Sequence, residues 1–582
     1  MLYSFIMDNC IFIKSKKWIV FALIVMTTIA FSWPIAVFAV TDAGTIQRTL
    51  PKPEPKIPTF ETVEPEVQDK VLDKGPTVNI TTFVFKGNTL ISTVELQALL
   101  ASYLGVPISL TQLEDIRVKV GELYRQKGFW ATAIYEDQDL STQTLIVTIY
   151  EGRVGSIGIE TDDVGDGDAL RFPESRIKDF VRRQQAEGEP INITELDYSI
   201  ADLESIPGIS ATVLLDRGEN VGETDIIVQA TNTPYLNGFF SLDNTGSRAT
   251  GYEQGILNLN IDSPFKQGEQ FNVMHLKSTG VDYFGAGVSY PLLANGTTMT
   301  YSFTTLQYEL GYPLKDLGGS GNASTNSLAL SKKLMRSDSF ELTGNINYAY
   351  QTYYNETGTE VVSSDKNIKG WTVDLSMFSQ DQWFGGGLWI NSLGYKVAKL
   401  DQGNYEADAA TSKTSGHYSK VNLNLLRIQQ LTQKDALWLT MNGQYAVDSN
   451  MDSAEKMSLG GATGVRGYPT AEANGDSGIL IQTEIKHTFT DKVQASIFYD
   501  WGQIYQYKYR WTDWNSADTS IPNQYQLKGA GFSLTWVPVE LLEVKLTGAR
   551  TIGTNKGAAS NGDDGDSTNK NSRLWATLTR TF

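Results

Sequence analysis

The sequence predicts a mainly β membrane protein, in which a transmembrane β-barrel of about 16 strands follows two small domains of the order βααββ. Three observations predict this fold class. The N-terminus has the pattern of an export signal, two consecutive segments share one order of strands and helices, and the remaining chain alternates apolar and polar residues without helical spacing. The length of 582 residues also exceeds what one ordinary soluble core requires.

The composition argues against two classes of function. The chain has 48 basic and 66 acidic residues, a net charge of −18, whereas proteins that bind nucleic acid carry a basic surface. Its single cysteine, Cys10, lies in a segment that we expect to be removed. We therefore expect no nucleic-acid partner, no disulfide framework and no cysteine-based metal site.

Residues 1–39 have the pattern of a signal peptide. Lysines precede an apolar run from Trp18 to Ala39, whose last four residues, Ala-Val-Phe-Ala, suit cleavage after Ala39. A run of this length could also anchor the chain in a bilayer, but Pro34 and the cleavage-like end favour removal. No later segment approaches ~18 uninterrupted apolar residues, so we expect no membrane-spanning helix after the leader.

Residues 40–76 are expected to hold a short helix and a linker. The segment Asp42 to Leu50 begins with residues typical of a helix start and places Ile46 and Leu50 four apart, which predicts a small docking helix. Residues 51–76 carry six prolines and alternating charges. This composition forms a stiff extended linker and buries no core.

Residues 77–154 predict the first βααββ domain. Ile80, Phe83 and Phe85 suggest a strand with one buried face, which ends in a turn at Gly87-Asn88, and helical spacing then occurs twice. The second helix is expected to stop at Lys127-Gly128. After the first strand, the expected elements are helices at 93–104 and 113–124 and strands at 132–135 and 145–149.

The same order recurs more weakly over residues 155–232. Pro207-Gly208 marks the turn between its helical and strand parts. The expected elements are a strand at 157–160, helices at 174–183 and 196–206, and strands at 211–215 and 225–229. The chain therefore carries two tandem modules of one type.

Residues 233–582 predict the barrel. In the stretch FELTGNINYAY (340–350), alternate residues from Phe340 to Tyr350 are mostly apolar and the intervening ones are mostly polar. Many such segments, separated by Gly, Asn, Asp and Ser turns, are typical of a barrel with an apolar outside and a wet inside. At about 10 residues per strand and about 10 per connection, the length gives about 16 strands, enough to enclose a lumen.

No catalytic, nucleotide, cofactor or metal site is expected. Residues 475–478 have the sequence GDSG, as in the nucleophile segment of a trypsin-like protease, but only three scattered histidines, at 275, 417 and 487, could act as a base. The glycines after 460 lack a phosphate-loop lysine and a following helix. Acidic clusters at 162–168 and 561–567 lack the EF-hand pattern, so we expect solvated turns there.

One arginine stands in a glycine-rich stretch, GGATGVRGYPT (460–470), inside a long loop near 456–478. Strand alternation in QASIFYDWG places Ser496, Phe498 and Asp500 on the face opposite to the apolar one. Asp500 should therefore point into the lumen. An arginine in a long loop is by default a solvated surface residue, but a guanidinium folded back into the barrel could meet this carboxylate in a directional, partly desolvated pair. Gly460, Gly461 and Gly464 would give the loop its tight turns.

Several motifs in combination resemble a known family. The segments FKGNT (85–89), YRQKGF (124–129) and VTIYEGRV (147–154) are similar to those of POTRA domains. The barrel contributes DNTGSRATG (243–251), GGATG followed by VRGY (465–468), and FYD (498–500). Together with the Asp-Ala-Gly segment at 42–44, they make the mature chain resemble a TpsB transporter of two-partner secretion, of the haemolysin-activator type.

The resemblance implies roles for particular residues. The long loop would be the sixth extracellular loop and would reach into the lumen, where Val465, Arg466, Gly467 and Tyr468 form a latch against Phe498 and Asp500 on the inner wall. The final strand, ending in Phe582, would be the signal through which the barrel-assembly machinery recognises the chain.

The resemblance also implies partners and a location. The barrel would lie in the lipid of the outer membrane as a monomer, with its N-terminal domains in the periplasm, and would export a secreted TpsA-type exoprotein that the POTRA domains recognise while it is unfolded. The principal alternative is an assembly or insertion factor of the same superfamily. A passive porin needs no periplasmic modules, and an outer-membrane enzyme needs a nucleophile and base that the sequence does not offer.

Overall fold

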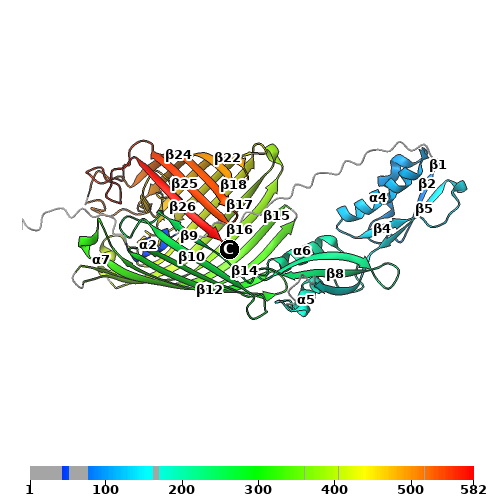
Figure 1. Ribbon diagram of the computed structural model, residues 1–582, viewed down its shortest axis with the longest axis horizontal. Coiled ribbons are helices and arrows are strands. Elements are labelled where there is room, and N and C mark those ends of the chain that lie inside the picture. The colour runs from blue at the N-terminus through cyan, green and yellow to red at the C-terminus, as the bar shows by residue number, and fades with distance from the viewer. Residues whose placement is uncertain are drawn as a thin grey trace, which may run out of the picture.

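The computed structural model describes residues 42–50, 77–161, 169–337, 339–358, 361–403, 405–516 and 518–582. The predicted leader, the proline-rich linker and the acidic cluster at 162–168 lie outside these residues and stay predictions. Two α/β units precede a barrel (Figure 1). The predicted fold class is confirmed.

The first α/β unit packs two helices on a three-stranded sheet. In α4 (Leu110–Gln126), Ser109 and Gln112 form a capping box, and Ile116, Val120 and Tyr124 are buried against the sheet at four-residue spacing. The sheet order is β2-β5-β4, with β2 parallel to β5. The other elements are β1 (Val78–Asn79), β2 (Thr82–Lys86), α3 (Thr93–Leu100), β3 (Pro107–Ile108), β4 (Ala131–Ile134) and β5 (Thr144–Glu151). Helix α3 is shorter than predicted, because residues 101–103 tighten into a 3₁₀ turn.

The second α/β unit repeats the arrangement and is joined closely to the first. Its elements are β6 (Arg153–Thr161), α5 (Glu174–Gln184), α6 (Ile193–Glu204), β7 (Ile209–Arg217) and β8 (Glu223–Asn232), in the sheet order β6-β8-β7. Trp130 of the first unit packs against the core of the second, and its backbone N–H donates to the Ile191 carbonyl at 3.1 Å. The two modules therefore share a continuous junction.

Within the described residues, sixteen antiparallel strands close the barrel, and β26 pairs with β9 at the seam. The strands are β9 (Leu236–Asp243), β10 (Gln254–Asp262), β11 (Gln270–Ser278), β12 (Val281–Leu293), β13 (Thr297–Glu309), β14 (Ser320–Ser337), β15 (Phe340–Thr357), β16 (Val361–Asp381), β17 (Gly387–Gln402), β18 (Gly416–Gln430), β19 (Asp435–Ala446), β22 (Ser477–Thr490), β23 (Val493–Tyr505), β24 (Gln524–Val539), β25 (Leu542–Thr551) and β26 (Ser572–Thr581). We call the rim beside the α/β units the near rim and the opposite one the far rim.

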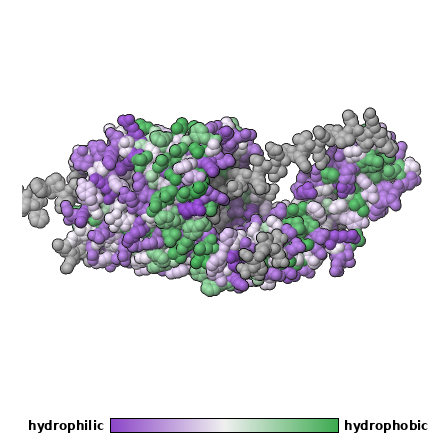
Figure 2. Space-filling model, in the orientation of Figure 1, coloured by the Kyte–Doolittle hydropathy of each residue, from purple (hydrophilic) through white to green (hydrophobic). Residues whose placement is uncertain are grey.

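The barrel wall has one apolar and one polar face. Figure 2 shows a hydrophobic band around the middle of the barrel, between two hydrophilic ends. Ile346, Ile497 and Leu574 lie on this outer face and are about half to two-thirds exposed, whereas Asp500 on the inner face is fully buried. This is the alternation that the sequence predicts for a membrane-spanning barrel.

The second α/β unit docks on the near rim. Asp202 of α6 forms ion pairs with Lys333 at 3.3 Å and with Arg336 at 3.2 Å, both near the end of β14. Arg176 of α5 donates to the carbonyl oxygens of Gln267, in the connection between β10 and β11, and of Pro291, near the end of β12. Polar and charged contacts therefore hold the second unit beside the near rim, next to the ends of β12 and β14 (Figure 1).

Two further observations concern helices. A short helix, α7 (Tyr405–Ala410), lies in the far-rim loop between β17 and β18, where the sequence analysis expected no helical segment. Among the described helices, none is long and apolar enough to cross a membrane.

Candidate functional site

The loop between β19 and β22 folds back into the barrel. Strands β20 (Met457–Ser458) and β21 (Asn474–Gly475) pair as a short ribbon, and residues 459–473 between them turn inward. Val465 and Tyr468 are buried in one apolar cluster with Ile504 and Leu527 of the inner wall. The apolar contacts thus fix the loop on the wall formed by β22, β23 and β24.

Arg466 lies at the centre of this contact. Its Nε donates to Asp500 Oδ2 at 2.9 Å and its Nη2 to Asp500 Oδ1 at 2.8 Å, and its backbone N–H also donates to Oδ2 at 3.0 Å. The guanidinium carbon lies 3.3 Å from the centroid of the Phe498 ring. Asp500 is fully buried and Arg466 is 6% exposed. The structure therefore brings together the three residues that the sequence analysis singled out.

Two members of the site were missed by the sequence analysis. Arg466 Nη1 donates to Glu484 Oε2 at 2.8 Å, and Trp575 Nε1 donates to the Arg466 carbonyl at 2.9 Å. Alternation along β22 and β26 could have placed both side chains in the lumen, but nothing in the sequence linked them to this loop. The arginine thus neutralises two carboxylates and contacts both β23 and the last strand.

The loop glycines allow close backbone approaches. Gly461 has a φ of 116°, which side chains rarely adopt. A Cβ on Gly464 would lie 2.0 Å from the Leu459 carbonyl oxygen, and one on Gly467 would lie 2.9 Å from the backbone of Arg550. A Cβ on Gly460 would clash with the Pro469 carbonyl oxygen at 2.4 Å. Replacement of these glycines would move the turn that carries Arg466.

The predicted docking helix lies inside the barrel, in the far half of the lumen (Figure 1). This helix is α2 (Ala43–Thr49), which Asp42 caps by accepting from the Thr45 backbone N–H at 2.8 Å. Ala43 and Ile46 are buried among lumen-facing side chains of the barrel wall. The helix and the inward-folded loop therefore fill the far part of the lumen together.

Ionic contacts hold the start of α2 to the wall and to the loop. Lys366 Nζ of β16 lies 3.1 Å from Asp42 Oδ2 and 2.8 Å from Asp452 Oδ1, and it also donates to Ser453 Oγ. The Ala43 backbone N–H donates to Asn355 Oδ1 at 2.9 Å. One lysine thus joins three separate parts of the chain.

The body of α2 packs closely on the loop. A Cβ on Gly44 would lie 2.6 Å from the Cβ of Ala454, so the helix approaches as near as its glycine allows. At its other end, Arg48 donates to Asn474 Oδ1 at 2.8 Å and to Ser458. Contacts of this kind are non-covalent and can be exchanged for others.

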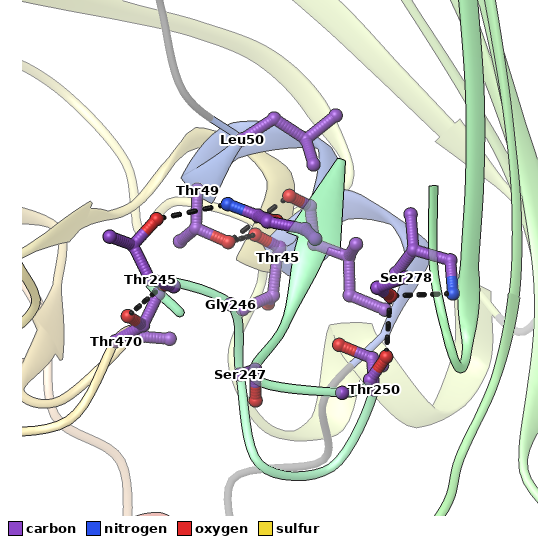
Figure 3. Close-up of a pocket in the computed structure, with 14 residues that line it drawn as sticks. Thr45, Thr49, Leu50, Thr245, Gly246, Ser247, Thr250, Ser278 and Thr470 are labelled. Atoms are coloured by element: carbon purple, nitrogen blue, oxygen red, sulfur yellow. Dashed lines mark hydrogen bonds between the residues drawn. The ribbon is translucent and has the colours of Figure 1, made fainter. Parts of the chain in front are cut away.

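A pocket between α2, the first far-rim loop and the inward-folded loop shows how these parts meet (Figure 3). Thr470 Oγ1 donates to the Thr245 carbonyl at 2.9 Å, which ties the folded loop to the DNTGSRATG stretch. Ser278 Oγ donates to the Thr250 carbonyl at 2.6 Å in the same place. The hydroxyl-rich lining gives weak, replaceable contacts rather than a ligand cage.

The acidic cluster at 561–567 differs from the solvated turn that we expected. Asp564 and Asp566 are buried, and Arg573 of β26 lies 2.9 Å from Asp566 Oδ2. Glu472 of the inward-folded loop accepts from the Gly565 backbone N–H at 2.6 Å and from Asn555 Nδ2 at 2.7 Å. These two aspartates are buried because the loop between β25 and β26 brings them to Arg573 and Glu472.

This contact predicts a pH dependence. Burial, with Asp564 and Asp566 nearby, raises the pKa of Glu472 from 4.5 to about 7. The pKa of Glu472 is raised in the folded protein, so the protonated side chain stabilises the fold fully below pH 4.5. This stabilisation is lost as pH rises through about 7, and the loss is at most about 3 kcal/mol. We expect the thermal midpoint of the protein to fall between pH 5 and pH 8, and to fall less in Glu472→Gln. An equal fall in both proteins would contradict this assignment.

The comparisons with known proteins place this architecture in a family. Residues 222–521, more than half of the chain, match the family described as haemolysin secretion/activation protein ShlB/FhaC/HecB. Residues 78–152 match the POTRA domain of the ShlB type. The chain belongs to this family.

Relatives and solved structures agree with the family assignment. The heme/hemopexin transporter protein HuxB of Haemophilus influenzae strain 86-028NP is 25% identical over 85% of this chain and 86% of its own length. The outer membrane transporter CdiB of Dickeya dadantii is 23% identical over 71% of this chain and 73% of its own length. The structure of CdiB from Escherichia coli has a TM-score of 0.65 at 17% identity, over 89% of this chain and 93% of the other, which shows a shared fold.

Membership of this family indicates the membrane in which the barrel lies and the side that each rim faces. The chain is an outer-membrane transporter of the two-partner secretion type, the near rim faces the periplasm with the POTRA domain and the second α/β unit, and the far rim is extracellular. In the part of the chain that the structure describes, no group of three or more histidine, cysteine, aspartate or glutamate side chains is arranged to hold a metal ion.

Proposed function

We propose that this chain recognises one unfolded partner protein at its POTRA units and exports it through the barrel lumen. Arg466 would latch the inward-folded loop, and α2 would leave the lumen during transport. The observation that carries this proposal is the lumen itself, which is filled by two pieces of the same chain through reversible contacts with side chains such as Lys366 and Asn355. Export in this form needs no catalytic step.

A route into the lumen starts at an edge strand. Strand β7 has nine residues and, among the described strands, pairs only with β8, so its other edge offers backbone groups to an extended segment. Leu214 on β7 is 48% exposed. Binding by an added strand makes loose sequence demands, which suits the capture of an unfolded chain.

A cysteine placed on this edge tests the proposal. The only native cysteine, Cys10, belongs to the predicted leader, so a single Leu214→Cys substitution gives one reactive thiol in the mature chain. We expect it to cross-link to a cysteine in the partner while secretion is under way. Val221→Cys in the neighbouring loop is the matched control, because Val221 is 77% exposed but lies off the edge. Equal cross-linking at both positions would contradict recognition by β7.

The second candidate, an assembly or insertion factor, rests on the seam. Only five residue pairs join β26 to β9, against seventeen between β14 and β15. The structure of BamA from Haemophilus ducreyi shares the fold, with a TM-score of 0.52 at 14% identity over 87% of this chain and all of the other. A short seam could open sideways instead of conducting through the lumen.

A disulfide across the seam separates the two candidates. Ser241 and Thr579 are register partners, and their hydroxyl oxygens lie 3.0 Å apart. We expect the double variant Ser241→Cys/Thr579→Cys, once oxidised, to secrete the partner at the rate of its reduced form, because the lumen stays available. Loss of secretion on oxidation, restored by a reductant, would favour the sideways route.

We further propose how the barrel reaches and occupies the membrane. Phe582 is 46% exposed, and its backbone exchanges two hydrogen bonds with Gly238 at the seam. This end of β26 would be the strand that the barrel-assembly machinery recognises. The chain would act as a monomer in outer-membrane lipid.

A further inference from the structure

A step in the extracellular rim lies between two neighbouring strands. Pairing between β24 and β25 ends at Gly529 and Thr551, yet β24 continues outward as far as Gln524. A pocket occupies this step, and Lys528 and Lys556 are among its lining residues. We call this pocket, together with the adjoining Arg550, the rim notch.

Two cations of the rim notch, Lys528 and Arg550, face outward. Along β24, Leu527 is buried towards the lumen, whereas Phe532, which shares the face of Lys528, is 61% exposed. Along β25, Ala549 is buried and Arg550 is exposed on the outer face. Both cations therefore lie on the lipid-facing side of the wall.

Neighbouring side chains indicate where the rim notch lies along the membrane normal. Trp501 on β23 is the register partner of Lys528, and its Nε1 donates to Gln526 Oε1 at 3.4 Å. Tryptophan and tyrosine on the outer face mark the boundary between the hydrocarbon layer and the headgroups. Exposed apolar side chains such as Phe532 and Leu546 begin just below. The notch cations thus lie at the level of the outer-leaflet headgroups.

Three other outward cations at this rim have carboxylate partners. Lys277 pairs with Asp282, and Lys369 and Lys399 pair with Asp401. Among the described residues, no carboxylate lies within ion-pair distance of Lys528, Arg550 or Lys556.

Two acids of the loop that carries Lys556 face the lumen side. Asp564 and Asp566, in the loop that leaves β25, are buried and turned towards Arg573 on the lumen side. Two carboxylates of this loop are therefore buried on the lumen side, whereas Lys556 is exposed. In a chain with a net charge of −18, this separation leaves a local positive site.

We propose that the rim notch binds a phosphate group of an outer-leaflet glycolipid. Guanidinium and ammonium groups are the side chains that hold phosphate, and their attraction is strong at a membrane surface. The amides of Gln524 and Gln526 line the same pocket and can hydrogen-bond sugar hydroxyls. The bound lipid tethers the base of the loop between β25 and β26 to the membrane, next to the contact between Glu472 and Gly565.

A charge-matched pair of variants tests the proposal. The notch variant is Lys528→Gln/Arg550→Gln/Lys556→Gln, and the control is Lys277→Gln/Lys369→Gln/Lys399→Gln, which removes three outward cations that have carboxylate partners. Each protein is purified from outer membranes in mild detergent, and the lipid A-type glycolipid bound per barrel is counted by native mass spectrometry. We expect the notch variant to retain about fivefold less glycolipid than wild type and the control to match wild type.

Three results would overturn the proposal. Equal glycolipid retention by wild type and the notch variant would show that the rim notch is not the binding site. An equal loss of glycolipid in the control would show an effect of surface charge alone. If added inorganic phosphate displaced the glycolipid as effectively as added bisphosphorylated lipid A does, the notch would be a general anion site. A heat-dependent shift in electrophoretic mobility, unchanged in both variants, confirms that the barrels are folded.

Discussion

Replacing Arg466 by Ala is expected to reduce secretion of the partner by more than tenfold while the barrel still assembles in the membrane. The substitution leaves Asp500, which is fully buried, and Glu484 without their cation. An uncompensated buried charge costs about 3–5 kcal/mol, and about 1.4 kcal/mol already corresponds to a tenfold change in population. Secreted partner in the medium is measured at equal amounts of barrel.

Two variants separate the latch from a general effect. Arg510→Ala removes an exposed arginine of another extracellular loop and should leave secretion unchanged. Arg466→Lys should give an intermediate loss, because an ammonium keeps the charge but cannot present the two parallel donors that reach Asp500. Normal secretion by Arg466→Ala would show that Arg466 does not act as a latch.

The Arg466 contact could be anticipated from strand alternation together with the resemblance of the VRGY and FYD segments to a known family. Alternation alone places Asp500 and Phe498 in the lumen, and the glycines around Arg466 allow a loop that approaches the wall closely. Glu484 follows the same alternation on β22. What the sequence lacked was a sign that one arginine would reach two strands at once.

The position of α2 could not be derived in the same way. Its capping residue and apolar spacing are local, and they predict a helix. Its partners Lys366, Asn355 and Ser453 lie more than 300 positions away and look like ordinary strand or loop residues. Only the closed barrel brings them around the helix, so a sequence pattern gives the helix but not its site.

Two local expectations failed for reasons of tertiary structure. The cluster at 561–567 has the composition of a solvated turn, yet Asp564 and Asp566 are buried because Arg573 compensates their charge. Strand β16 has 21 residues, about twice the length assumed for counting strands. The count was still right, because other connections are short, such as the two residues between β11 and β12.

The close contact between Gly44 of α2 and Ala454 also supplies controls for the variant Gly44→Ala, which is expected to displace α2. Gly158→Ala in the second POTRA unit adds the same methyl group where the nearest atom is 4.0 Å away, and it should have no effect on the pore. Gly44→Ala/Ala454→Gly removes the opposing methyl group but leaves the Ala454 Cα 2.9 Å from the new Cβ, so it should recover the closed state only in part.

Gly44→Ala itself is expected to displace α2 and open the pore. The new Cβ would lie 2.6 Å from the Ala454 Cβ, so the helix must move away from the loop, and this movement separates Asp42 from Lys366. Overpacking of this kind costs about 1–3 kcal/mol, which favours the displaced helix by about 5- to 150-fold. Conductance of the purified protein in planar bilayers measures the outcome. A conductance equal to wild type would mean that α2 does not close the lumen.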